Sequence, residues 1–183
     1  IILLLSHLLL ISGFISLLII IFREQIIMLS LDFMNASNEV LLHSKIYLEY
    51  RIWSIPAIFL RDIIIGYYIG TQNIKAAIVV SITVNLLNII LDYYFIYILH
   101  YSIEGVAIAS LISEYSVIIF ALYAIRSEGI FKNINIKIGE IFNWIMIKKK
   151  LLINIDMFIR SFILLIIFIY FMRTGASYGD SVL

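Results

Sequence analysis

Five long apolar runs dominate the 183 residues of this chain and limit what it can fold into. Each run approaches or reaches the roughly 20 residues that a helix needs to cross a bilayer. Lipid offers the backbone no hydrogen bonds, so we expect each run to be helical. The runs cover about residues 1–22, 52–70, 76–99, 103–125 and 151–172. The sequence therefore predicts an all-α integral membrane protein, a multi-span helical bundle.

The composition supports this class and excludes several functions. Hydrophobic residues make up 63% of the chain and the mean hydropathy is +1.09, whereas soluble proteins are about 45–50% apolar. A net charge of +1 and the lack of a basic patch predict no nucleic-acid partner. The chain has no cysteine, no metal-ligand spacing among its three histidines and no nucleophile or nucleotide motif. We therefore expect neither an enzyme nor a cofactor or metal centre.

Charged side chains inside the apolar runs are the strongest functional signal. A charge at membrane depth is costly and rare, and it usually marks an ion or substrate path. Two bases cannot neutralise four acids, so at least two acids must be protonated, hydrated or holding a cation. This is the chemistry of a cation-coupled transporter. The acids are Asp62, Asp92, Glu114 and Asp156, and the bases are Arg61 and Arg160.

The third run carries a polar stripe that ends in Asn88 and Asp92, one helical turn apart. Ser81 and Asn85 continue the same face toward the start of the run. An amide oxygen and a carboxylate suit a hard cation such as Na⁺, and a buried carboxylate can instead carry a proton. The alternative is a hydrogen-bond ladder between helices. We favour the ladder for Ser81 and Asn85, and the functional interpretation for Asp92.

The other charged positions allow several pairings. Glu114 is either a proton relay or the partner of Arg61 or Arg160, and the sequence does not separate these. Arg61 and Asp62 are adjacent and point about 100° apart on a helix, so we do not expect them to pair. Asp156 and Arg160 are four residues apart and form a ready intrahelical pair with a structural or gating role.

The segments between the runs give the boundaries and the orientation. A helix that begins after Ser37 is expected to continue into the second run, with a kink at Pro56. The basic stretch 126–150 contains an expected amphipathic surface helix at 138–147. Lysine and arginine concentrate in this stretch and in the turn 71–75, so the positive-inside rule places both on the cytoplasmic side.

Four sequence blocks carry a resemblance to a known family. They are Tyr50–Ala57 followed by Gly66 and Gly70–Asn73, then Asn85–Asp92, then Glu104–Ser110 with Glu114 and Tyr115, and finally Asn154–Ser161. In this order and spacing they resemble the multidrug and toxic compound extrusion (MATE) family, in particular its DNA-damage-inducible protein F-like branch. The resemblance covers roughly residues 50–183.

The resemblance implies a fold of twelve helices in two bundles of six, of which this chain would hold the third to seventh. Residues 1–125 then belong to the amino-terminal bundle and 126–150 to a cytoplasmic linker between the bundles. Residues 151–183 begin the carboxy-terminal bundle. We accordingly expect an internal fragment of a longer protein, which spans the bacterial inner membrane and is a monomer at full length.

The resemblance also implies a function and a site. Members of the family export cationic or amphipathic organic compounds in exchange for H⁺ or Na⁺. Their cation site matches Asn88, Asp92 and Ser110 here, with Ser where Thr is usual, and adds an Asp on a first helix that this chain does not contain. Arg61 stands where Asn is usual. It is able to neutralise Asp92 or Glu114, which would weaken the coupling.

Two alternatives stay open at this point. A lipid-linked oligosaccharide flippase of the same wider superfamily would need a basic central cavity for pyrophosphate, and Arg61 and Arg160 are its only candidates. A non-transporting remnant of such a protein is the other, supported by the additional charge of Arg61.

Overall fold

The structure is a computed structural model that describes residues 2–34, 36–127 and 155–177, together with residues 145, 148 and 152. Throughout this part of the chain the fold is all-α, as predicted, and no strand occurs in it. The helices are α1 (Ile2–Ile21), α2 (Arg23–Met34), α3 (Asn38–Arg51), the 3-10 turn η1 (Ile52–Ser54), α4 (Ile55–Gly70), α5 (Ile74–Tyr93), the π-helical segment η2 (Tyr94–Ile98), α6 (Ile103–Tyr115), α7 (Val117–Ser127) and α10 (Ile155–Ser177).

Four helices in the described residues are long and apolar enough to cross a membrane, and they match four of the five predicted runs. They are Leu3–Ile21, Asn38–Gly70, Ile74–Ile98 and Ile103–Ala124. The fifth run lies in α10, whose continuous apolar part within the described residues, Ile159–Phe171, is shorter.

The second of these helices begins at Asn38, well before the apolar run that predicted it. Its 33 residues correspond to about 50 Å, against a hydrocarbon core of about 30 Å. Ser37 has the extended backbone of an N-cap, although its side chain makes no capping hydrogen bond. The long helix is therefore one element made of α3, η1 and α4, as the sequence predicted.

Pro56 disturbs this long helix one turn upstream of its own position. It lies in the first turn of α4, where a proline is tolerated. Because proline has no N–H, it cannot donate to the carbonyl of Ile52. The chain tightens instead, and the N–H of Ile55 donates to Ile52 in the 3-10 turn η1. The predicted irregularity is thus a short 3-10 turn between Arg51 and Pro56.

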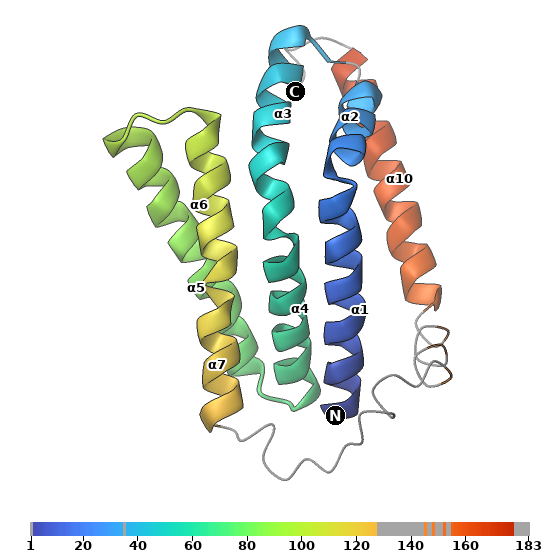
Figure 1. Cartoon of the computed structure of the whole chain (residues 1–183), viewed down its shortest axis with the longest axis vertical. Helices are drawn as coiled ribbons and strands as arrows, with labels where there is room; N and C mark the ends of the chain where they lie inside the picture. Colours follow the sequence, from blue (N-terminus) through green and yellow to red (C-terminus); the bar gives the residue numbers. More distant parts are fainter. Residues whose placement is uncertain are drawn as a thin grey trace.

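The long α3–α4 helix runs through the middle of the bundle (Figure 1). Helix α1 packs against α4, while α5, α6 and α7 contact α3 or α4 from the other side. The turn between α4 and α5 and the end of α7 lie at the same end of the bundle (Figure 1). This agrees with the common cytoplasmic side assigned to residues 71–75 and to the start of the basic stretch.

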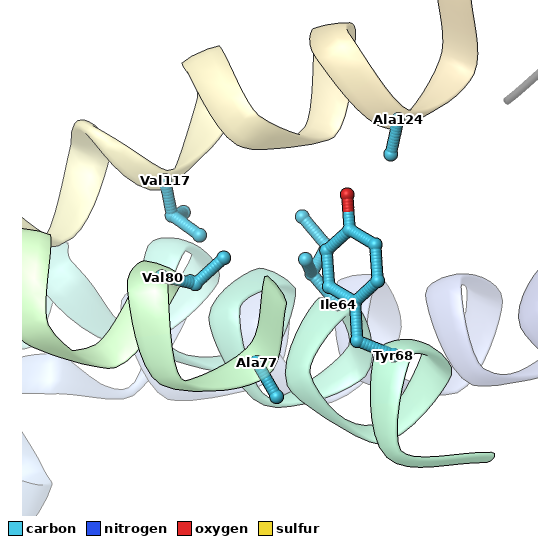
Figure 2. Close-up of a cluster of buried hydrophobic side chains, with 6 residues drawn as sticks. All are labelled: Ile64, Tyr68, Ala77, Val80, Val117 and Ala124. Atoms are coloured by element: carbon cyan, nitrogen blue, oxygen red, sulfur yellow. The ribbon is translucent and has the colours of Figure 1, made fainter. Parts of the chain in front are cut away.

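The core forms where α4, α5 and α7 meet. Figure 2 shows its buried side chains, which are Ile64, Tyr68, Ala77, Val80, Val117 and Ala124. On α6, Ala107 and Ala109 are fully buried, which confirms that small residues there allow close helix packing. This packing brings the polar face of α5 against α6.

Gly105 fixes how closely α6 approaches the end of α5. A Cβ at this position would lie 2.8 Å from the Cβ of Tyr101 and 3.1 Å from the Cβ of Phe95. Phe95 lies in the π-helical segment that follows α5, and its ring stacks on Tyr101 at a centroid distance of 5.9 Å. Only glycine therefore fits against this wide turn without moving backbone-anchored atoms.

We expect Gly105→Ala to destabilise the protein by about 1–3 kcal/mol, the usual cost of overpacking. Gly66→Ala is the matched control, because nothing lies within 4 Å of a Cβ placed there. In a helix interior that change is expected to be neutral or to stabilise by up to about 1 kcal/mol. Thermal unfolding in detergent measures both, and equal stability of the two variants would contradict the close approach at Gly105.

Candidate functional site

The predicted cation-site residues Asn88 and Ser110 meet across the contact between α5 and α6. The Nδ2 of Asn88 donates to the Oγ of Ser110 at 3.2 Å. Both side chains are half-buried. The hydrogen bond uses the amide nitrogen and leaves the amide carbonyl oxygen of Asn88 as a further acceptor or ligand.

Asp92 lies one helical turn after Asn88 on the same face of α5. Its Oδ1 is buried and has no hydrogen-bond partner among the described residues. A buried polar atom without a partner is costly, and a carboxylate more so than most. The arrangement therefore favours a proton or a cation at this oxygen.

The earlier members of the polar stripe differ from these two. Ser81 is half-buried, but Asn85 is exposed in the described part of the chain. The hydrogen-bond ladder that the sequence predicted for Ser81 and Asn85 is not formed by these residues there. Asn85 is thus the member of the stripe that faces outward, whereas Ser81, Asn88 and Asp92 are all half-buried.

Glu114 is the most deeply placed charge of the described residues, and it is paired. Only 5% of the residue is exposed. The Nη1 of Arg61 donates to its two carboxylate oxygens at 2.6 and 2.7 Å. Of the alternatives that the sequence left open, the structure therefore gives Glu114 as the partner of Arg61. Within the described residues Arg61 pairs with Glu114 and Asp62 and not with Asp92, so it neutralises Glu114.

Two sequence expectations about arginines are corrected. Arg61 and Asp62 do pair, at 3.2 Å between Nε and Oδ1. The long arginine side chain turns its Nε toward its neighbour while its terminal nitrogen points inward, so the 100° between adjacent residues does not prevent contact. Arg51 lies just before the apolar run 52–70 and was not included among the intramembrane charges, but it also turns inward and donates from Nη2 to Glu114 at 3.4 Å. Arg51 is therefore a base that the count of two bases against four acids left out.

Sequence reasoning missed two residues that hold this region. Arg51 was overlooked because the apolar run that predicted the second span begins only after it, at residue 52. Tyr115 donates from its hydroxyl to the carbonyl of Trp53 at 2.9 Å, inside the 3-10 turn η1. A signal was present in the sequence, since Pro56 predicts irregular backbone that needs side-chain partners.

Three predicted site residues remain to be placed, namely Asp62, Asp156 and Arg160. Asp62 lines an apolar groove of about 630 Å³ between α1 and α4, away from the Asn88–Ser110 contact. Arg160 is exposed on α10. Asp156 lies in α10, but its side chain is outside the described residues, and so the predicted pair with Arg160 stays a prediction. Most of the stretch 126–150, including the expected amphipathic helix, also lies outside them.

Comparison with known proteins agrees with this architecture. The family model described as MatE matches residues 2–94, which is half of the chain. The chain belongs to the MatE family. Together with the four membrane-length helices in its described part, this makes it a multi-pass membrane protein.

Three curated relatives are also similar to this chain, and the alignment with the first extends well beyond residues 2–94. DNA damage-inducible protein F of Escherichia coli (strain K12) is 30% identical over 169 residues, which is 91% of this chain and 36% of that protein. Protein DETOXIFICATION 43 of Arabidopsis thaliana is 29% identical over 63% of this chain and 22% of its own length. Multidrug and toxin extrusion protein 1 of Oryctolagus cuniculus is 27% identical over 46% of this chain and 15% of its own length.

The MatE chain thus aligns with about a third of the length of its bacterial relative, and with less of the other two. The likeness begins earlier than residue 50, where the sequence blocks first placed it, because the family match starts at residue 2. No solved structure gives a significant match.

We expect Arg61→Met to lower the stability of the protein by about 3 kcal/mol, because it leaves the buried Glu114 with only the longer contact from Arg51. Lys45→Met is the control: Lys45 pairs with Glu49 at 4.0 Å on the surface, and such pairs contribute at most about 1 kcal/mol. Thermal unfolding in detergent compares the two. A loss no larger for Arg61→Met than for Lys45→Met would show that the inward pair is not a structural requirement.

Proposed function

We propose that this chain carries the cation-coupling site of a secondary antiporter, which exports drugs or other organic compounds across the bacterial inner membrane in exchange for H⁺ or Na⁺. The observation that supports it is the position of Asp92. Its buried Oδ1 has no partner among the described residues, and it lies one turn from the Asn88–Ser110 contact. Glu114, the acid of which only 5% is exposed, is instead paired with Arg61.

The proposed coupling follows from the charge of Asp92. Occupied by a proton or a cation, the carboxylate no longer carries an uncompensated charge in a dry helix contact. Without a bound proton or cation, the Asp92 carboxylate favours a conformation that admits water. A cation that binds one of the two conformations more tightly shifts the equilibrium between them, and this drives alternating access around a fixed site.

The two candidate ions make different demands on the site. A proton requires only the Asp92 carboxylate. A hard cation such as Na⁺ needs several oxygen ligands, of which Asp92, the carbonyl oxygen of Asn88 and the hydroxyl of Ser110 are the candidates in this chain. Further ligands would have to come from elsewhere in the transporter.

The proposed domain organisation follows the family resemblance. Residues 1–125 form part of the amino-terminal bundle, 126–150 link the bundles and 151–183 begin the carboxy-terminal bundle. The transporter is proposed to act as a monomer in the bilayer on small organic substrates, with no cofactor besides the coupling ion, no nucleic-acid partner and no enzymatic activity.

We expect Asp92→Asn in the transporter to abolish export driven by a cation gradient, because an amide can neither carry the proton nor supply the anionic ligand. Insertion into the membrane should be unchanged, since the substitution removes a charge from a membrane helix. Dye efflux from energised vesicles measures export, with separate pH and Na⁺ jumps to identify the ion.

The control for this experiment is Glu104→Gln, the same change of carboxylate to amide at an exposed position in the first turn of α6. It should retain export. Gradient-driven export that survives in Asp92→Asn would refute the proposed site. A substrate that is a glycolipid instead of a dye would favour the flippase, and no transport of either by the unmodified protein would favour the remnant.

A further inference from the structure

The last turn of α6 holds the irregular middle of the long α3–α4 helix. Glu114 accepts hydrogen bonds from Arg51, which ends α3, and from Arg61, which lies in α4. These two arginines therefore flank the 3-10 turn η1. Between them, the hydroxyl of Tyr115 donates to the carbonyl of Trp53 within that turn. Adjacent residues of α6 thus bind the long helix before, within and after its disturbed segment.

These contacts offset two local costs. A buried carboxylate is costly unless it is paired, and only 5% of Glu114 is exposed. The arginines compensate for that charge from the neighbouring helix. The 3-10 turn interrupts the regular helical hydrogen bonds, and the hydroxyl of Tyr115 supplies a donor to the carbonyl of Trp53 within it.

The same turn controls the rotation of α6 toward α5. Ser110 lies four residues before Glu114, so the two side chains are neighbours along one side of α6. Ser110 accepts from Asn88 on α5, whereas Glu114 accepts from Arg61 on α4. A rotation of α6 that released Glu114 from Arg61 would also carry Ser110 away from Asn88.

We propose that Glu114, Arg61 and Tyr115 form a polar clamp that positions Ser110 against Asn88 and thereby sets the affinity of the Asp92 site for its coupling cation. This inference rests on the proposed function. The clamp residues do not touch the cation; they are positioning residues. Loss of partners that orient metal ligands lowers metal affinity by about 10–100-fold, which sets the expected scale.

The test measures the cation concentration that gives half-maximal transport, in the transporter reconstituted into vesicles. For Glu114→Gln we expect this concentration to rise about 10-fold while the maximal rate is largely kept, because the liganding side chains remain. Glu114→Asp keeps the charge and should recover most of the affinity. Glu104→Gln, the same chemical change at an exposed position of α6, should match the unmodified protein.

A second variant protects the test against misfolding. Tyr115→Phe removes only the hydrogen bond to Trp53 and introduces no unpaired charge. It should raise the half-maximal cation concentration about threefold, and this variant decides the question if Glu114→Gln does not accumulate in the membrane. An unchanged half-maximal concentration in every clamp variant that accumulates would overturn the clamp, whatever their thermal stability.

The failure of this inference is distinguishable from that of the proposed function. Transport that stays coupled to the cation gradient in Asp92→Asn would refute both the proposed site at Asp92 and the clamp. Transport that is lost in Asp92→Asn but has unchanged cation dependence in Glu114→Gln and Tyr115→Phe leaves the site standing and refutes only the clamp. A loss of thermal stability without a shift in cation dependence likewise counts against positioning.

Discussion

The ion pair between Arg61 and Glu114 is the interaction on which the account of this protein depends. Charges in a bilayer are tolerated when they are paired or hydrated. Here one guanidinium nitrogen contacts both oxygens of Glu114 at 2.6 and 2.7 Å. This pairing decides which acid is neutralised. Arg61, an additional charge relative to the family pattern, binds an acid of α6 and leaves Asp92 of α5 without a basic partner in the described residues.

The position of that pair follows from the backbone around it. Pro56 and the 3-10 turn before it interrupt the long α3–α4 helix at the level where α6 ends. The last turn of α6 provides a donor to the carbonyl of Trp53 in this turn and an acceptor for the flanking arginines. Gly105 acts at the other end of α6, where it allows the helix to approach the π-helical segment after α5. Together these contacts set how α5 and α6 face each other at Asn88 and Ser110.

Much of this organisation was predictable from the sequence. The apolar runs identified four membrane-length helices, and the family resemblance placed Asn88 and Ser110 in one site, where their side chains meet. The structure corrected what spacing cannot give. The direction of a long side chain depends on its partners in three dimensions, so neither the Arg61–Asp62 contact nor the inward turn of Arg51 followed from helical periodicity. The start of the second helix after Ser37, by contrast, was predicted from its N-cap residue, although its first turns are polar and lie outside the apolar run.

The most direct measurement is equilibrium binding of the coupling cation to the purified transporter, without any transport. The amount of ²²Na⁺ bound would be recorded for the unmodified protein, for Asp92→Asn and for Arg61→Met. The binding and release of protons would be followed in the same proteins with a pH dye. The account predicts a saturable site in the unmodified protein that is lost in Asp92→Asn. In folded Arg61→Met the site should remain but bind the cation more weakly, because Arg61 pairs with Glu114 and not with Asp92. Binding that survives in Asp92→Asn, or that disappears only with Arg61, would contradict it.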